Sequence, residues 1–333
     1  MHLIRFWFTN ARYIALPQSI MPAVLAVCMA LTSPHFTVLP AILAVLGVIF
    51  GHLGINLIDD YFDYQVKDTS FRAQLTHQGF RARIAKCQYL TSGEATVRQL
   101  IIASIVFCSI SLVCGFLIFL QRGMVIFYFA LATGIAGISY SGGPLKLSYR
   151  GLGELQIGVM FGPLLMTGVY CAACGAFSWP VLTVSIPVGL LVANIVYTHA
   201  IMDYEPDRQV GKMTFAILIG KKKYMLYTTF CILFLSFGTI GAGVLSNCLQ
   251  VHYLLVFLTL PMAVSLFYLV KEFIRDPQRS FSPRFWMGPM ISWDKYKTAG
   301  IEWFMIRWLL AQNLLSFFCL IIMLINLVYK IVE

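Results

Sequence analysis

The chain has 333 residues, of which 59% are hydrophobic and only 11% charged, with a net charge of +10 and a mean hydropathy of +0.80. A soluble domain is only about half apolar, so this composition excludes the soluble classes and indicates an integral membrane protein. The apolar runs are close to 20 residues long and too continuous for the strands of a β-barrel, which predicts an all-α helical bundle.

Nine apolar segments are long enough to cross a bilayer as helices. The first follows Arg5 and Arg12, contains two prolines and lacks a small-residue cleavage site, so we expect a mature helix rather than a signal peptide. The nine expected spans are 13–32, 38–62, 99–121, 123–140, 155–175, 179–201, 224–246, 251–270 and 308–329.

The positive charges are distributed unevenly between the two sides of this arrangement. Of the 24 Lys and Arg residues, only Arg122 and Lys330 fall on the side that holds the C-terminus. Because basic loops stay in the cytoplasm, we expect a multi-pass protein of the cytoplasmic (inner) membrane with a cytoplasmic N-terminus. Attraction to anionic lipid headgroups accounts for the basic balance without a nucleic-acid partner.

The second expected span ends in an acidic stretch, NLIDDYFDYQVKD, over residues 56–68. Helical spacing places Asn56, Asp59, Asp60 and Asp63 on one face, and Asp68 follows. Crowded carboxylates repel one another unless a cation lies among them, and Mg²⁺ prefers such oxygen ligands. These five residues are therefore our candidate metal ligands, with capping of a helix end in water as the simpler alternative.

Basic and glycine-rich segments follow the acidic stretch. The loop after residue 68 is basic, and Gly142-Gly143-Pro144 ends the fourth span beside two further cations. Glycines let a backbone approach a ligand closely, although an ordinary turn explains them equally well. Attraction to anionic lipids of the inner leaflet is likewise a sufficient explanation for any single basic residue of the loop after residue 68. Our candidate diphosphate ligands here are Arg72, Arg83, Lys86, Tyr140, Lys146 and Arg150.

A second acidic cluster ends the sixth span and runs from Asp203 through Asp207 to Lys212. Asp203 and Asp207 are four residues apart, and His199 lies one turn before Asp203 if the helix persists to Pro206. We expect the two aspartates to bind metal and Lys212 to bind diphosphate. His199 is either a core histidine or a functional one.

The two acidic clusters resemble each other. Asp59-xxx-Asp63-x-Gln-Val repeats as Asp203-xxx-Asp207-x-Gln-Val, each time after the second span of a four-span set. We therefore expect a single domain over the whole chain, with two related halves enclosing one central cavity. The halves cover residues 13–140 and 155–270, and residues 308–329 form a final helix.

Two carboxylate pairs beside cations and apolar walls suit a substrate with a diphosphate head and a hydrocarbon tail. Mg²⁺ would stabilise the diphosphate as a leaving group. The stretches NLIDDYFDYQVKDT, YSGGPLKLSYRGLGEL and DYEPDRQVGKMTFAILIG resemble those of UbiA-superfamily intramembrane prenyltransferases, most closely the branch that prenylates 1,4-dihydroxy-2-naphthoate for menaquinone. The resemblance implies nine helices, an active site facing the cytoplasm and Mg²⁺-dependent transfer from a polyprenyl diphosphate to an aromatic acceptor. It implies catalytic roles for Asp63, Asp203 and Asp207, and the position of His199 one turn before Asp203 makes it a further catalytic candidate.

Some positions depart from that branch, which has Asn-Asp in place of Asp59-Asp60 and Asn-Asn in place of His199-Ala200. The naphthoate is the expected acceptor, with 4-hydroxybenzoate, homogentisate or a tetrapyrrole as alternatives. His199 could orient the acceptor, accept its proton or act as an outer metal ligand. A secondary transporter is the competing class, but acids at the membrane edge beside basic loops favour the transferase.

Overall fold

The computed structural model describes residues 2–66, 87–209 and 212–332, and all the regular structure in those ranges is helical. Eight helices there are long and apolar enough to cross a membrane. They correspond to eight of the nine expected spans. The remaining span, the first, is a shorter apolar helix of 14 residues that follows a 3-10 turn. The prediction of an all-α integral membrane protein is confirmed.

The apolar helices follow one another along the chain, two of them divided into shorter segments. In order they are α2 (Pro17–Ala30), α3 (Val38–Val66), α6 (Val97–Arg122), α7 (Met124–Ser141), α8–η3–α9 (Gly153–Val159, Met160–Leu164, Leu165–Cys174), α10 (Trp179–Met202), α13 (Lys222–Leu245), η4–α14 (Val251–Thr259, Leu260–Arg275) and α16 (Glu302–Val332). The short helices are α1 (His2–Asn10), η1 (Tyr13–Ala15), α5 (Gln88–Thr91), η2 (Leu147–Tyr149), α11 (Tyr204–Gln209), α12 (Phe215–Ile219), η5 (Phe285–Met287) and α15 (Trp293–Thr298).

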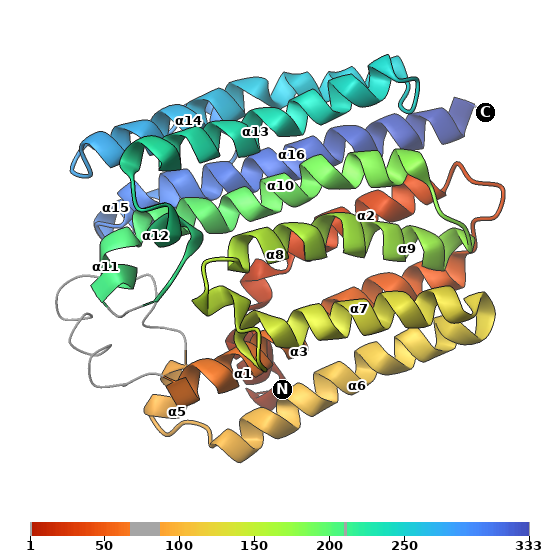
Figure 1. Cartoon of the computed structure of the whole chain (residues 1–333), viewed down its shortest axis with the longest axis horizontal. Helices are drawn as coiled ribbons and strands as arrows, with labels where there is room; N and C mark the ends of the chain where they lie inside the picture. Colours follow the sequence, from red (N-terminus) through yellow and green to blue (C-terminus); the bar gives the residue numbers. More distant parts are fainter. Residues whose placement is uncertain (1, 67–86, 210–211, 333) are drawn as a thin grey trace.

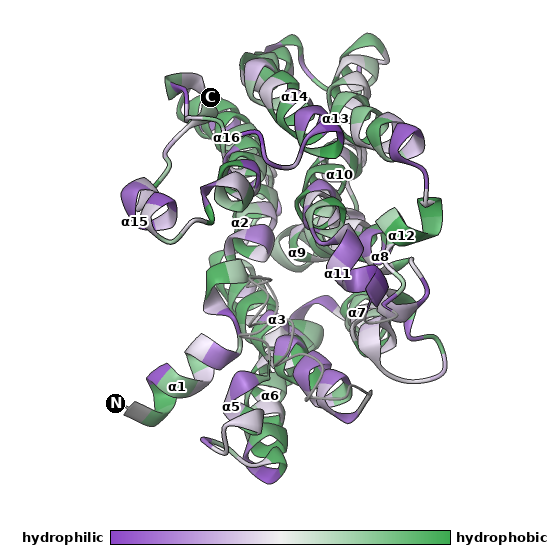
Figure 2. Ribbon diagram, turned by 90° about the vertical axis from the view of Figure 1, so that its left-hand side faces the viewer, coloured by the Kyte–Doolittle hydropathy of each residue, from purple (hydrophilic) through white to green (hydrophobic). Residues whose placement is uncertain are grey.

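The long helices run side by side along the longest axis of the molecule (Figure 1). The short helices α5, α11, α12 and α15 gather at one end of this bundle, whereas the C-terminus lies at the opposite end. Figure 2 shows that hydrophilic residues concentrate at the end that carries the short helices, while the helices behind it are largely hydrophobic. The bundle therefore has one polar end, which is suited to bind a charged substrate.

Helix α10 is the most buried of the candidate spans and packs against α13, α16 and the α8–η3 segment. Glycines allow the closest of these contacts. A Cβ atom on Gly189 would lie 2.3 Å from the carbonyl oxygen of Gly158, and one on Gly162 would lie 2.5 Å from the Cα of Gly189. Small residues let membrane helices approach to backbone contact, which fixes α10 firmly within the bundle.

Local sequence signals explain where the helices begin and end at the polar end. Thr96 and Gln99 form a capping box that starts α6. Helix α7 ends at Ser141, where the predicted break at Gly142 is found. The sixth span does not persist to Pro206, the condition under which His199 and Asp203 would share one helix. Helix α10 ends at Met202, and Asp203 adopts φ −97° and ψ 15° before α11 begins.

Candidate functional site

The three described acids of the first cluster, Asp59, Asp60 and Asp63, are all buried near the polar end of α3. Ionised carboxylates are costly in such surroundings unless they are paired or hydrogen bonded. Each of the three has partners from other parts of the chain. These partners come from two directions, the N-terminal segment with α5 and the segment that follows α7. The single helical face predicted from the sequence did not distinguish these two directions.

Arg12, which precedes the first apolar helix, neutralises the first side of this cluster. Its guanidinium lies 3.1 Å from Asp59 and 3.4 Å from Asp60, and it donates to the backbone carbonyl of Asn56 at 2.8 Å. The Asn56 side chain donates in return to the carbonyl of Ala11 at 2.9 Å. Burial lowers the pKa of Arg12, but attraction to Asp60 and Asp59 outweighs this effect and leaves the pKa above its ordinary value, so Arg12 stays charged.

Asp60 has a further partner on α5, besides the guanidinium that it shares with Asp59. The Tyr89 hydroxyl donates to one of its carboxylate oxygens at 3.1 Å, and the Cys87 thiol donates to its backbone carbonyl at 3.4 Å. Burial and the nearby Asp60 carboxylate raise the pKa of Tyr89, so the phenol keeps its proton and remains a donor. The Tyr89 ring also meets Phe6 and Trp7 of α1 edge to face. Asp60 thus joins α3 to α1 and α5.

Asp59 and Asp63 are held on the other side by the segment that follows α7. The Ser141 hydroxyl donates to Asp59, and the Tyr149 hydroxyl donates to Asp63. Ser148 supports this arrangement, since its hydroxyl lies 3.1 Å from that of Ser141. Both carboxylates are therefore oriented by donors from residues 141–149, a segment that the sequence marked only by its glycines and cations.

The second cluster follows the end of α10 and is also buried. The Asp207 amide donates to the carbonyl of Asp203 at 2.8 Å, so the two acids stay one turn apart although the long helix has ended. The Lys212 amide donates to the carbonyl of Asp207 at 2.9 Å, which turns the chain back toward α12. Backbone hydrogen bonds thereby connect Asp203 to Asp207 and Asp207 to Lys212.

The segment 141–154 connects the two acidic clusters. Beyond its bonds to Asp59 and Asp63, the Gly151 amide donates to the carbonyl of Met213 at 3.0 Å. The Glu154 carboxylate accepts from the Phe215 amide at 3.1 Å and interacts electrostatically with Lys212 and Asp207.

Tyr140 stands at the start of this connection. Its phenol interacts electrostatically with Asp59 and Asp63 of the first cluster and with Glu154 of the connecting segment. Tyr140 and Glu154 thus connect the first cluster to Lys212 and Asp207 of the second, whereas a shared site for the two clusters stays a prediction.

The remaining predicted residues are placed less centrally. Asp68, Arg72, Arg83 and Lys86 lie outside the described residues. Lys146 and Arg150 are exposed on the connecting segment, where Arg150 donates to the carbonyl of Pro144 at 3.0 Å. His199 faces α16, where its ring contacts Phe304 and Trp308.

Sequence reasoning missed five residues that the structure brings to the clusters. Only one carried a usable signal. Arg12 is the nearest cation before a row of acids in an apolar run, and buried acids require a positive partner. Nothing local marked the tyrosines, the serine or the glutamate, because their roles depend on contacts between distant segments. The five are Arg12, Tyr89, Ser141, Tyr149 and Glu154.

The donor set fits a magnesium ion held jointly with a phosphate group. Among the described residues, no three Asp, Glu, His or Cys side chains converge as a self-contained metal cluster. Mg²⁺ is commonly bound by only one or two carboxylates together with substrate phosphates. The pairs Asp59–Asp63 and Asp203–Asp207 offer buried carboxylate oxygens of that kind.

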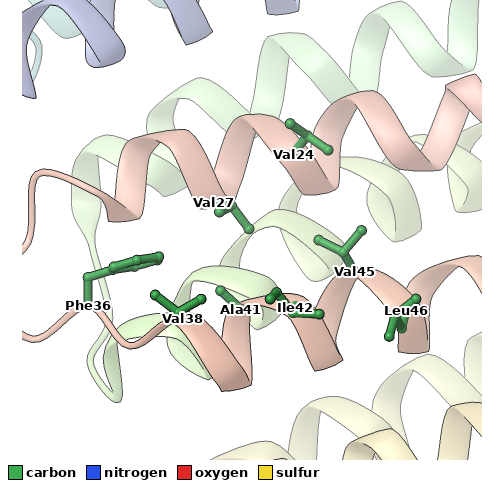
Figure 3. Close-up of a pocket in the computed structure, with 8 residues that line it drawn as sticks. All are labelled: Val24, Val27, Phe36, Val38, Ala41, Ile42, Val45 and Leu46. Carbon is green, nitrogen blue, oxygen red and sulfur yellow. The ribbon is translucent and has the colours of Figure 1, made fainter.

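A separate pocket of about 290 Å³ lies between α2 and α3 (Figure 3). It is formed by the part of α3 that is farthest from the acids, and only hydrocarbon side chains line it. This pocket is therefore suited to lipid or other hydrocarbon chains and is not the polar site. Its lining residues are Val24, Val27, Phe36, Val38, Ala41, Ile42, Val45 and Leu46.

The sequence matches the model of the UbiA prenyltransferase family over residues 19–288. It is 26% identical to a 1,4-dihydroxy-2-naphthoate octaprenyltransferase of Bacillus subtilis, over 78% of this chain and 79% of that protein. It is 32% identical to a 2-carboxy-1,4-naphthoquinone phytyltransferase of Synechocystis, over 45% of this chain. That alignment spans about half (48%) of the relative's length. A 33% identical match to human UbiA prenyltransferase domain-containing protein 1 covers 44% of this chain and 43% of that protein.

The fold is shared with solved membrane proteins. A UbiA homolog from Archaeoglobus fulgidus bound to GPP and Mg²⁺ superimposes with a TM-score of 0.60 at 16% identity, covering 95% of this chain and 99% of that one. A UbiA homolog from Aeropyrum pernix gives 0.59 at 18% identity, covering 95% and 98%. At these identities the likeness establishes the fold alone.

Proposed function

Since the chain belongs to the UbiA prenyltransferase family, we propose that it transfers a polyprenyl group from a polyprenyl diphosphate to an aromatic acceptor. The observation that carries this proposal is the pair of buried carboxylate clusters joined by residues 141–154. A multi-pass membrane protein can draw a long hydrocarbon tail from the bilayer while its polar end receives the diphosphate.

The proposed acceptor is 1,4-dihydroxy-2-naphthoate, the substrate of menaquinone biosynthesis. Two relatives support this choice, because a naphthoate and a naphthoquinone appear in their names and one of them aligns over most of both chains. The excess of basic residues at the polar end supports a cytoplasmic orientation in the inner membrane.

Asp59, Asp63, Asp203 and Asp207 would hold Mg²⁺, with Tyr149 and Ser141 keeping two of these carboxylates oriented. When bound, Mg²⁺ neutralises the diphosphate and stabilises it as a leaving group. Lys146, Arg150 and Lys212 supply further positive charge. The apolar walls of the bundle exclude water, which would otherwise capture the allylic cation.

In this proposal the aromatic ring attacks the allylic carbon as the carbon–oxygen bond breaks, and the ring then loses a proton. His199 lies one turn before Asp203, and the free ring nitrogen of a neutral imidazole is a suitable acceptor for that proton.

The direct test incubates purified protein with a labelled polyprenyl diphosphate, Mg²⁺ and a panel of aromatic acceptors. We expect a prenylated naphthoate, its loss in EDTA and its recovery on adding Mg²⁺. Full activity in EDTA would contradict the metal assignment, and product with 4-hydroxybenzoate alone would replace the proposed acceptor.

A further inference from the structure

The face that α16 turns toward α10 combines aromatic rings with buried hydrogen-bond donors. Phe304, Trp308 and Gln312 are spaced four residues apart and so share this face. The His199 ring of α10 packs against two of them, with its centroid 4.9 Å from that of Phe304 and 5.8 Å from that of Trp308. The interplanar angles are 42° and 35°, so the three rings are tilted toward a common stack.

Two donors on this face have no acceptor among the described residues. The indole Nε1–H of Trp308 and the amide Nε2–H of Gln312 are both buried and make no hydrogen bond there. A buried donor without a partner costs roughly 1–3 kcal/mol, and water in the bilayer core cannot readily relieve that cost. A ligand that brings an oxygen acceptor between α10 and α16 would satisfy both donors.

Other faces of α16 contrast with this one. Asn313 donates to the backbone carbonyls of Met287 and Pro289 at 2.9 Å each. Asn326 donates to the carbonyl of Ile322 at 2.8 Å and accepts from Tyr253 at 3.1 Å. These two amides on other faces of α16 are satisfied within the protein, whereas the donors of Trp308 and Gln312, like one guanidinium nitrogen of Arg307, are not.

The solvent exposure of the four side chains is also consistent with a ligand site. His199, Phe304, Trp308 and Gln312 are partly exposed, although the adjacent residues Ala200, Ile201, Met305, Ile306 and Arg307 are buried. These four side chains are therefore not fully enclosed by the described residues, and the same holds for their neighbours Trp303, Leu309 and Asn313.

We propose that Trp308 and Gln312, together with the His199 ring, form the subsite that binds the oxygen substituents of the aromatic acceptor. This inference rests on the proposed prenyl transfer, and it assigns residues of the last helix, α16, to acceptor binding. Flat rings suit a planar ligand by offset stacking, and the two N–H groups suit a hydroxyl or carboxylate oxygen.

The placement also bears on the size of the acceptor. Along the helix axes, the distance from Asp203, past His199, to the level of Gln312 on α16 is two to three helical turns, or roughly 12–15 Å. That span exceeds a single six-membered ring with its substituents and favours a two-ring acceptor such as a hydroxynaphthoate.

Two substitutions remove one donor each, Trp308→Phe, which keeps an aromatic ring but is smaller, and Gln312→Leu, which keeps a similar size. Matched controls are Trp303→Phe, whose ring stacks on Phe273 on another face of α16, and Gln121→Leu, which is exposed at the far end of α6. The probe is 1-hydroxy-2-naphthoate, and its binding to purified protein is measured by titration calorimetry. The binding of a prenyl diphosphate with Mg²⁺ is measured separately.

We expect each donor variant to bind the naphthoate about tenfold more weakly, because a hydrogen bond to a charged group is lost. Binding of the prenyl diphosphate should stay unchanged, and Gln312→His, which keeps a donor, should restore part of the naphthoate affinity. Wild-type affinity for the naphthoate in both folded donor variants overturns the subsite. A wild-type protein that binds neither prenyl diphosphate nor Mg²⁺ overturns the proposed function instead.

Discussion

Replacing Arg12 by glutamine tests whether the N-terminal segment stabilises the acidic cluster. The substitution removes a guanidinium that lies 3.1 Å from Asp59 and 3.4 Å from Asp60 and leaves both buried carboxylates without it. Removing one member of a buried ion pair costs about 3–5 kcal/mol. Because the Arg12 side chain is 31% exposed, solvent screening reduces the expected loss to about 2–3 kcal/mol.

The assay is thermal unfolding of the detergent-purified protein, followed by intrinsic fluorescence. A loss of this size should lower Tm by roughly 4–10 °C. Arg5→Gln is the matched control, since Arg5 lies on the same segment but is exposed. The double variant Arg12→Gln/Asp60→Asn removes one of the stranded charges and should recover part of the lost stability. If Arg12→Gln melts at the same temperature as Arg5→Gln, the ion pairs contribute nothing and the reasoning fails.

Three further predictions concern chemistry, packing and topology. Asp63→Asn and Asp207→Asn should each reduce prenyl transfer by about 10²-fold or more at an unchanged Tm, because each removes a charge that stabilises the leaving diphosphate. The control is Asp294→Asn, at an exposed position, and near-normal turnover in either site variant would refute the site. Gly189→Ala should destabilise the protein by roughly 1–3 kcal/mol through overpacking, since the added Cβ would lie 2.3 Å from the Gly158 carbonyl oxygen. Gly238→Ala should leave Tm unchanged, because a Cβ there has no neighbour within 4 Å. Equal Tm values for the two variants would count against the contact. In a cysteine-free background, an impermeant thiol reagent added to intact cells should label Lys330→Cys but not Lys222→Cys, and the reverse pattern would invert the topology.

The arrangement of helices was largely decided by the sequence. Lipid leaves the backbone no hydrogen-bonding partner outside a helix, so long apolar runs must form helices and their boundaries can be read from charges, glycines and prolines. The break at Gly142 was found where expected, and the family was recognised from the acidic stretches and the segment between them. The duplication of the two halves, and the metal-binding roles of the individual acids, stay predictions.

Only the tertiary structure decided which side chains meet. Arg12 reaches Asp59 across 47 positions of the chain, and Tyr149 reaches Asp63 across 86. No local pattern encodes such pairs, because they depend on how α3, α7 and the N-terminal segment pack. The same holds for His199, which the sequence placed beside the acids but which the packing of α10 on α16 placed against Phe304 and Trp308. Helical periodicity fixes the direction of a side chain around its own helix, whereas its partner is set by interhelical packing that a single sequence does not record.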